Sequence, residues 1–275
     1  MSKIRLDVLL VERNLVETRE KAKRAVMAGL VYSDQERLDK PGMKVDETIP
    51  LTVKGKVMPY VGRGGLKLEK ALQVFSVDVR DKIMMDIGSS TGGFTDCALQ
   101  SGAARCYAID VGYNQLDWKL RNDPRVVVME RTNFRYVTEE NLEHGLPNFA
   151  SIDVSFISLK LILPVLKKLL VANSDTVALI KPQFEAGREQ VGKKGIVRDK
   201  KIHVEVLNKI LTFAEAEGFT LHGLTFSPIT GGDGNVEFLA HLGWKKEEPG
   251  KTLEELNPEE VVNEAHSELK SAQNI

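Results

Sequence analysis

The chain has 275 residues, of which 42% are apolar and 28% are charged, as in ordinary soluble globular proteins. This length supports one sizeable core and a small satellite domain. The net charge is only −1, but residues 1–70 hold 15 Lys and Arg against 10 Asp and Glu, whereas residues 245–275 hold 4 against 8. A basic first segment and an acidic last one indicate that only part of the protein contacts phosphates.

Several functional classes are excluded by what the chain lacks. Cys97 and Cys106 have neither metal-ligand spacing nor a disulfide framework, so we expect buried thiols and no metal. Lys3, Arg5 and Asp7 interrupt any apolar signal region, and no apolar run approaches the roughly 18 residues that span a bilayer. The sequence therefore predicts a cytoplasmic protein without membrane association.

Residues 1–58 are predicted to form a small first domain. Apolar residues at helical spacing predict a short helix over 5–12. Thr18 is expected to cap a second helix that stops at Gly29. Short strands and turns are expected over 31–53.

The patterns Arg-Leu-Asp-x-Leu-Leu, Thr-Arg-Glu-Lys-Ala, Ala-Gly-Leu-Val, Pro-Gly-x-x-Val and Ile-Pro-Leu run through this domain. Together they resemble the alpha-L RNA-binding motif of the ribosomal protein S-four type, although Tyr32-Ser33-Asp34 replaces a turn more often like Val-Asn-Gly. A charged helix alone would indicate only a solvated face. The resemblance implies shape recognition of RNA, with phosphate contacts from four basic residues. These are Arg5, Arg19, Lys23 and Arg24.

Residues 59–244 alternate strand and helix patterns, which predicts an α/β fold with a mainly parallel sheet covered on both faces. Strands are expected near 83–87, 105–110, 126–129, 149–154, 176–181, 220–226 and 236–241. Helices are expected near 66–75, 93–101, 114–121, 159–171 and 201–217. Residues 245–275 are expected to form an acidic tail. Its sequence is compatible with a helix around 258–269 and equally with a mobile segment.

The stretch from Lys82 to Asp96 predicts a buried strand, a glycine-rich turn and the start of a helix. Glycine lets the backbone approach a ligand closely because it lacks a Cβ. Ser90 stands where the dinucleotide fingerprint requires its second glycine, which favours S-adenosylmethionine over NAD. The expected cofactor contacts here are Asp86, Gly88, Ser90, Thr91, Gly92, Gly93 and Phe94.

Two further polar residues follow strands of the expected sheet, where ligands of open α/β sheets bind. Asp110 comes about 20 residues after the glycine turn and suits the two hydroxyls of a ribose, with a helix N-cap as the alternative. Asn133 follows the third strand and can reach an adenine, but an ordinary turn asparagine is an equally good interpretation.

The end of the fourth strand, at Asp153, indicates the methyl acceptor. Amino-group methylases usually carry an Asn/Asp-Pro-Pro-aromatic turn here, which is absent. Base-carbon methylases need a cysteine nucleophile near this point, and both cysteines lie elsewhere. An aspartate alone favours oxygen as the acceptor.

Lys181 ends the apolar fifth strand, where partial desolvation would favour the neutral amine and equip it for proton transfer. The alternative is a lysine at the sheet rim whose charged end reaches water. Glu237 lies within the last apolar strand, and a buried carboxylate requires a partner, so we expect it to pair with Lys181. Lys67 begins the helix that precedes the glycine turn. The basic, glycine-rich segment 187–199 is either a mobile substrate loop or a plain surface loop.

Five motifs in order carry a second resemblance: Arg63-Gly-Gly-Leu-Lys67, Asp86-x-Gly-x-x-x-Gly-Gly-Phe-Thr-Asp96, Asp153-Val-Ser-Phe-Ile-Ser158, Lys181-Pro-Gln-Phe-Glu185 and Asn235-Val-Glu-Phe238. They look like the TlyA/haemolysin A family, which joins an alpha-L RNA-binding domain to a Rossmann-like, FtsJ-like methyltransferase domain.

The resemblance implies that S-adenosylmethionine is the cofactor and that the substrate is ribosomal RNA or a ribosomal subunit, with ribose 2′-oxygen, often of cytidine, as the acceptor. By resemblance, Lys67, Asp153, Lys181 and Glu237 form the catalytic tetrad of ribose 2′-O-methyltransferases. The alternatives are a membrane-active haemolysin, which the family's historical name suggests, and a non-catalytic RNA-binding protein of ribosome assembly. A Rossmann oxidoreductase is disfavoured by the missing glycine.

Overall fold

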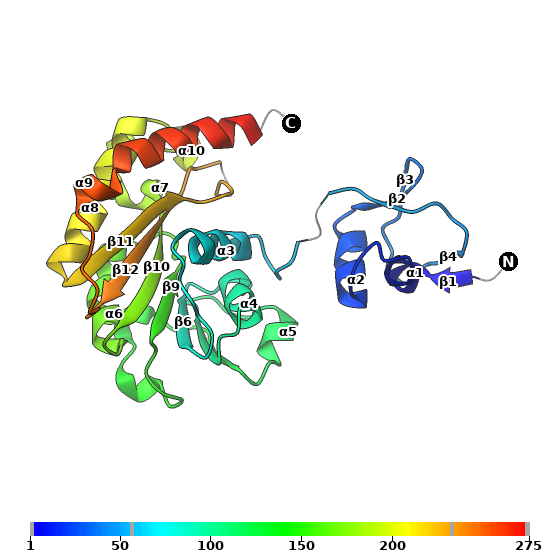
Figure 1. The fold of residues 1–275 in the computed structure, drawn as a ribbon, viewed down its shortest axis with the longest axis horizontal. Helices are drawn as coiled ribbons and strands as arrows, with labels where there is room; N and C mark the ends of the chain where they lie inside the picture. The colour runs from blue at the N-terminus through cyan, green and yellow to red at the C-terminus, as the bar shows by residue number, and fades with distance from the viewer. Residues whose placement is uncertain (1–2, 56–57, 232–233, 273–275) are drawn as a thin grey trace. The chain divides into compact units, whose positions relative to one another are not determined.

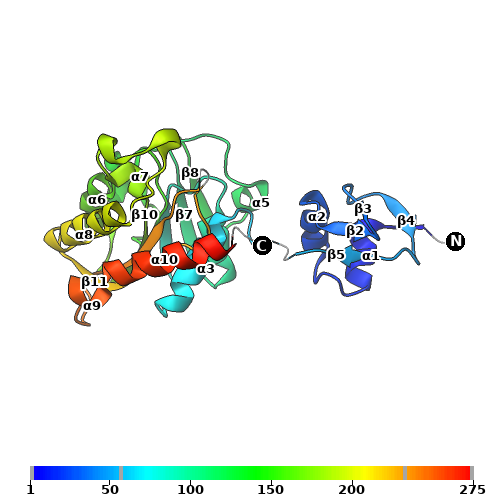
Figure 2. The same cartoon turned by 90° about the horizontal axis from the view of Figure 1, so that it is seen from above.

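The computed structural model describes residues 3–55, 58–231 and 234–272 (Figures 1 and 2). The chain divides into two compact units, residues 1–60 and residues 61–275. Each unit has its own hydrophobic core, so each is described by itself.

The first unit packs helices α1 (Leu6–Glu12) and α2 (Arg19–Met27) beside short antiparallel strands. β1 (Lys3–Arg5) pairs with β4 (Lys44–Asp46), and β2 (Val31–Ser33) pairs with both β3 (Glu36–Arg37) and β5 (Thr52–Val53). The predicted cap of the second helix is confirmed, because Thr18 Oγ1 accepts a hydrogen bond of 3.2 Å from the Lys21 amide. The small core includes Leu6, Leu10, Ala22 and Val26, which are fully buried.

The second unit is built on a seven-stranded sheet with the order β11-β12-β10-β9-β6-β7-β8. The bounds are β6 (Ile83–Ile87), β7 (Arg105–Ile109), β8 (Val126–Met129), β9 (Phe149–Ile152), β10 (Ser174–Ile180), β11 (Phe219–Phe226) and β12 (Phe238–Trp244). The strands from β8 to β10 are parallel, whereas β12 is antiparallel to both of its neighbours. The predicted α/β class with a mainly parallel sheet is confirmed.

Helices cover both faces of this sheet (Figures 1 and 2). They are α3 (Gly64–Val74), α4 (Gly93–Gln100), α5 (Trp118–Arg121), α6 (Leu163–Leu169), α7 (Pro182–Glu185), α8 (Lys200–Ala216), α9 (Leu253–Leu256) and α10 (Pro258–Ala272). Single 3-10 turns are η1 (Phe134–Tyr136), η2 (Glu139–Asn141), η3 (Leu159–Leu161), η4 (Arg188–Gln190) and η5 (Lys193–Gly195). The helix α3 packs against α4 and reaches β12.

Two predicted helices are shorter than expected. The helix expected over 114–121 is confined to α5, because Asn114 has a φ of 58° and Glu130 Oε1 accepts a hydrogen bond of 3.2 Å from the Gln115 amide. The helix expected over 159–171 is divided into η3 and α6. Pro164 lies in the first turn of α6, where its missing amide hydrogen is tolerated, whereas a continuous helix would need that donor.

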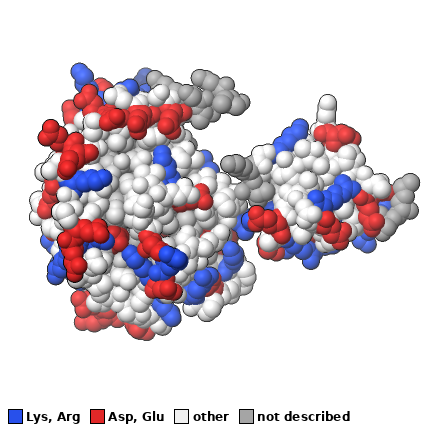
Figure 3. Space-filling model, in the orientation of Figure 1, with Lys and Arg blue, Asp and Glu red and all other residues white. Residues whose placement is uncertain are grey.

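The acidic last segment forms a helix that belongs to the second unit. Val262 and Ala265 of α10 are buried in the same core as the sheet, and α10 packs against α8 and β11. The helical alternative for this segment is therefore confirmed. Its outer face is acidic, as the row of Asp and Glu side chains over α10 in Figure 3 shows.

Candidate active site

The glycine turn after β6 is shaped by two positive φ angles, 84° at Gly88 and 94° at Gly92, which favour glycine. A Cβ on Gly88 would collide with the backbone carbonyl of Asp153, and a Cβ on Gly92 would collide with Leu120. The turn thus lies directly against the exit of β9.

Asp86 supports this turn from inside the fold. Its carboxylate is fully buried and accepts hydrogen bonds from the Thr95 amide (3.0 Å), Thr95 Oγ1 (2.7 Å) and Ser151 Oγ (3.0 Å). Burial raises the pKa of Asp86 to about 6. Neither Asp86 nor Gly92 lines the two cavities described next, and the cofactor contacts expected for them stay predictions.

The first cavity, here called the Asp110 cavity, has a volume of about 420 Å³ and lies outside the ends of β6, β7 and β9. Asp110 Oδ2 accepts from the Ser90 amide at 2.8 Å, and Oδ1 accepts from the Gly112 amide at 2.7 Å. Two carboxylate oxygens offer about four lone-pair sites, so capacity remains for two ligand hydroxyls. Apolar walls come from Ile109 and Phe134.

Asn133 also lines the Asp110 cavity, and its Oδ1 caps η1 by accepting from the Arg135 amide at 3.1 Å. The turn interpretation of Asn133 is therefore confirmed, and its position beside the cavity keeps the adenine contact as a proposal.

The second cavity, here called the tetrad cavity, has a volume of about 280 Å³. All four predicted catalytic residues line it, namely Lys67, Asp153, Lys181 and Glu237. The other predicted residues on its wall are Gly88, Ser90, Thr91, Gly93 and Phe94. Because Gly88, Ser90, Asp153 and Ser155 line both cavities, the two cavities adjoin at the glycine turn.

The four charged residues form one continuous chain of ion pairs. Glu237 Oε2 lies 2.6 Å from Lys67 Nζ, which lies 3.8 Å from Asp153 Oδ2. Asp153 Oδ1 in turn lies 2.5 Å from Lys181 Nζ, which also donates to Ser155 Oγ at 3.0 Å. Two cations and two anions balance within a largely buried site, where an unpaired charge would be costly.

The predicted pairing of Glu237 with Lys181 is wrong. Glu237 bonds to Lys67, and Lys181 bonds to Asp153. The reason is the packing of α3 beside β12, which brings Lys67 to Glu237, while the neighbouring strand β9 supplies Asp153 to Lys181.

Phe156 is a candidate that the sequence interpretation quoted in a motif but gave no role. It is 90% exposed, has a φ of 64°, and lines the Asp110 cavity. Its ring centroid lies 4.9 Å from that of Phe184, which follows Lys181 on α7. A large apolar side chain held in a left-handed conformation and in solvent is unfavourable without a binding role, so Phe156 belongs to the candidate site.

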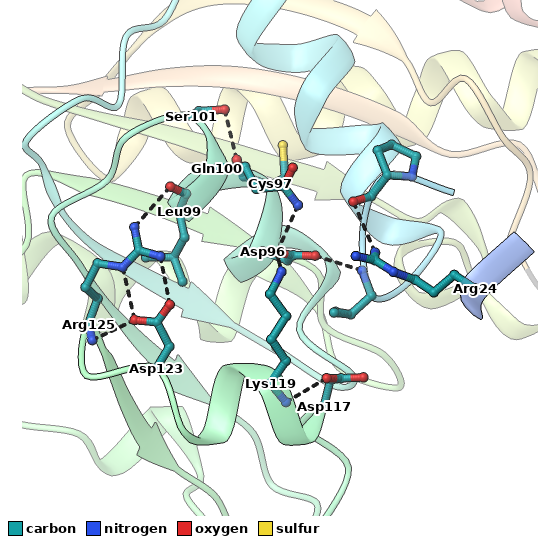
Figure 4. A network of polar contacts seen from close by, with 12 residues as sticks. Arg24, Asp96, Cys97, Leu99, Gln100, Ser101, Asp117, Lys119, Asp123 and Arg125 are labelled. Atoms are coloured by element: carbon teal, nitrogen blue, oxygen red, sulfur yellow. Dashed lines mark hydrogen bonds and ion pairs between the residues drawn. The ribbon is translucent and has the colours of Figure 1, made fainter. Parts of the chain in front are cut away.

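Asp96 holds the glycine-turn helix against neighbouring elements (Figure 4). Its buried carboxylate accepts from the Val61 amide at 2.9 Å, from Gln100 Nε2 at 3.0 Å and from Lys119 Nζ at 3.3 Å. The Val61 bond fixes the segment that leads into α3. Asp96 thereby helps to place Lys67, although it contacts neither cavity.

The four predicted RNA-contacting residues of the first unit have partners within that unit. Arg5 donates to Asp7 through Nε and Nη2 at 2.9 and 3.0 Å, and Arg19 Nε donates to the same carboxylate at 2.9 Å. Asp7 is fully buried, and the guanidinium of Arg5, with that of Arg19, holds its pKa at about 2. Lys23 Nζ lies 2.8 Å from Glu20, which is exposed.

Arg24 Nη1 donates to the Pro59 carbonyl at 3.3 Å, again within the first unit. The side chains of Arg5 and Arg19 remain 44% and 52% exposed, so both still present donors to solvent.

The segment 187–199 is tied to Asn235, two residues before Glu237. Asn235 Oδ1 accepts from the Val197 amide at 3.0 Å, and Asn235 Nδ2 donates to the Gly195 carbonyl at 2.9 Å. The mobile substrate loop and the plain surface loop stay open as interpretations.

The model of the FtsJ-like methyltransferase family matches residues 60–244, and the model of the S4 domain matches residues 4–48. The chain belongs to the FtsJ-like methyltransferase family. It is an S-adenosylmethionine-dependent methyltransferase with an N-terminal S4 domain, the architecture that the two resemblances implied.

Related proteins cover nearly the whole chain. A Bacillus subtilis protein named "Putative rRNA methyltransferase YqxC" is 68% identical over 98% of this chain and 96% of its own length. The "16S/23S rRNA (cytidine-2'-O)-methyltransferase TlyA" of Mycobacterium tuberculosis is 40% identical over 96% of this chain and 97% of its own length. A solved structure, "Putative hemolysin from Streptococcus thermophilus", is 56% identical, covers 100% of both chains and has a TM-score of 0.78.

The residues of the Asp110 cavity fit the family's cofactor, because a carboxylate with spare acceptor sites adjoins apolar walls. Within the described ranges 3–55, 58–231 and 234–272, no cluster of three His, Cys, Asp or Glu could hold a metal ion. Over the same described residues, no helix has the length and apolar character needed to cross a membrane.

Proposed function

We propose that this FtsJ-like methyltransferase methylates the 2′-oxygen of a ribose in ribosomal RNA, with cytidine as the target nucleoside. The observation that carries the proposal is the ion-pair chain of Lys67, Asp153, Lys181 and Glu237, in a cavity that adjoins the cofactor-sized Asp110 cavity. The named activities of the relatives support the choice of ribosomal RNA and of cytidine.

In this proposal one cavity binds the cofactor and the other binds the acceptor ribose. In the Asp110 cavity, Asp110 would hold the ribose hydroxyls of S-adenosylmethionine, and Asn133 would face its adenine. The bound cofactor supplies an electrophilic methyl group next to the shared wall at Gly88 and Asp153. The acceptor ribose would enter the tetrad cavity, so that its hydroxyl approaches this wall in line.

A ribose hydroxyl is a poor nucleophile at neutral pH, so the site must stabilise the oxygen as it loses its proton. Lys181 Nζ has three donor positions as an ammonium. Asp153 and Ser155 occupy two of them, which leaves one for the acceptor oxygen. Lys181 acts either as the proton acceptor or as a fixed positive charge beside the oxyanion. Lys67, held by Glu237, positions the ribose or its adjacent phosphate.

The first unit would supply RNA affinity through Arg5, Arg19, Lys23 and Arg24. Their charges contact phosphates and leave sequence choice to the methyltransferase unit. Ribosomal RNA or a ribosomal subunit is therefore the proposed partner.

The test is to map 2′-O-methyl groups on ribosomal RNA from cells that contain the wild-type protein, no protein, or the Lys181→Ala variant. We expect one or more cytidine sites that require the protein and are lost in the variant. Lys168→Ala, which removes an exposed lysine of α6, is the matched control and should keep the modification. Ribosomal RNA with the same methylation in all four strains would refute the proposal and favour a non-catalytic role in ribosome assembly.

A further inference from the structure

Glu185 is a buried carboxylate that no step of the proposed chemistry uses. It ends α7, four residues after Lys181, and is only 5% exposed. Its Oε2 accepts from Ser158 Oγ at 2.6 Å, and its Oε1 accepts from the Leu159 amide at 2.7 Å. Both oxygens are therefore committed to the loop that follows β9.

These two bonds connect the segments that carry the Lys181–Asp153 pair. One segment runs from Lys181 to Glu185, and the other runs from Asp153 to Leu159. At their near ends the segments meet through the 2.5 Å contact between Lys181 Nζ and Asp153 Oδ1. At their far ends they meet through Glu185, with the Phe156–Phe184 ring contact of 4.9 Å between.

The loop after β9 packs against the core through Val154, Ile157 and Leu159, but the side chain of Phe156 stays outside it. Phe156 is 90% exposed, so its burial contributes little to stability. Its φ of 64° lies in the left-handed region, which is unfavourable for a bulky side chain. The main chain of Glu185, in contrast, is held in place, because Lys209 Nζ of α8 donates to the Glu185 carbonyl at 2.9 Å. Glu185 therefore connects α8, which bonds to its main chain, with the loop after β9, which bonds to its side chain.

We infer that Glu185 is a positioning residue, which holds Asp153 in place beside Lys181 by fastening the loop after β9 to α7. This inference rests on the proposed function, because it concerns the same reaction. Glu185 contacts neither cavity, so its effect reaches the reacting atoms only through Asp153 and Lys181. Burial raises the pKa of Glu185, and that cost agrees with a carboxylate retained for geometry.

The test compares Glu185→Ala and Glu185→Gln with the wild-type protein in single-turnover methyl transfer from S-adenosylmethionine to ribosomal RNA. A glutamine can accept from the Leu159 amide through Oε1 and donate to Ser158 Oγ through Nε2, so it preserves both connections. We expect Glu185→Gln to stay within about threefold of the wild-type rate. Glu185→Ala should lose roughly 10- to 100-fold in rate, as expected for a misplacement of about 1 Å.

Binding measurements distinguish a positioning role of Glu185 from a general loss of structure. The Kd for S-adenosylmethionine and the KM for RNA should each change by less than about threefold in Glu185→Ala, because the lost interaction acts on the reacting pair. The exposed Glu215 of α8 provides the control, and Glu215→Ala should match the wild type throughout. If Glu185→Ala does not fold, Ser158→Ala removes only one of the two bonds and should show a smaller rate loss with unchanged affinities.

A double variant gives the decisive outcome. In an Asp153→Ala background, Glu185→Ala should add no more than a twofold loss, because its route to Lys181 is already gone. Fully additive losses, a Glu185→Gln variant as slow as Glu185→Ala, or normal rates in both Glu185→Ala and Ser158→Ala would each overturn the inference. A wild-type protein that methylates no RNA would instead refute the proposed function itself.

Discussion

Glu237 Oε2 and Lys67 Nζ are separated by 2.6 Å, although the two residues are 170 positions apart in the chain. The pair joins the start of β12 to α3, and the side chains of Lys67 and Glu237 are only 10% and 3% exposed. Each charge therefore depends on the other, because removal of one leaves a buried partner without a counter-ion.

The first prediction tests this pair by stability. Glu237→Ala should lower the free energy of unfolding by about 3–5 kcal/mol, since it strands the Lys67 ammonium beside Asp153 alone. Adding Lys67→Met should recover part of that loss, measured by urea unfolding. Adding Lys181→Ala should recover none. If Lys181→Ala instead recovered stability and Lys67→Met did not, Glu237 would pair with Lys181 in solution.

The second prediction concerns the cofactor. Asp110→Ala removes a charge-assisted hydrogen-bond acceptor worth about 1.5–3 kcal/mol, so affinity for S-adenosylmethionine should fall by roughly 10- to 100-fold in calorimetry. Asp78→Ala is the control, because Asp78 is paired with the neighbouring Arg80 at the surface. Equal affinities for the two variants would remove Asp110 from the cofactor site.

The third prediction concerns RNA. Replacing Arg19 and Lys23 by glutamine should weaken RNA binding and flatten its salt dependence by about one unit of slope for each lost phosphate contact. Affinity for S-adenosylmethionine should not change, which serves as the internal control. If deletion of residues 1–58 leaves RNA affinity and methylation intact, the first unit has no part in substrate binding.

The fourth prediction concerns pH. Burial, with His266 nearby, lowers the pKa of His203 to about 4, from an ordinary value of 6.5. His203 of α8 contacts His266 of α10 at 2.9 Å between Nδ1 and Nε2, and the Val197 carbonyl lies 3.2 Å from Nε2. The unfolded chain binds the proton more readily, so stability from the neutral ring is present above about pH 6.5 and is lost as the pH falls towards 4.

The loss from His203 should approach about 3 kcal/mol when the shift is fully expressed. Urea unfolding at pH 7.5 and at pH 5 should show about 2 kcal/mol of this loss, because pH 5 still lies above the pKa of the folded state. His203→Gln should remove most of this pH dependence, whereas replacement of the exposed His144 should leave it in place. Parallel pH dependences in wild type and His203→Gln would contradict the assignment.

The sequence predicted the site well where local pattern decides it. An apolar run followed by a polar residue marks a strand end, and strand ends of a parallel sheet meet at one edge, so Asp110, Asp153 and Lys181 were placed correctly beside the cavities. The same reasoning failed for side-chain direction. A motif does not show that the carboxylate of Asp86 is directed towards Thr95 and Ser151.

Packing between distant elements decided the rest. The Lys67–Glu237 bond depends on how α3 lies beside β12, which no local pattern specifies. Glu185 belongs to a motif that the sequence interpretation quoted, but its partner Ser158 belongs to another motif, and only the fold brings them together. The short α5 was missed because Glu130, 15 residues away, takes the amide of Gln115.

The antiparallel strand β12 also sets the order in which the site can be assembled during synthesis. β12 is inserted between β10 and β11, yet it is the last strand of the sheet to leave the ribosome. Glu237 immediately precedes β12, whereas Lys67, Asp153 and Lys181 are made earlier. A nascent chain that ends before Glu237 would hold the other three charges without this balancing acid. The complete charge chain therefore forms only when the final strand has been inserted.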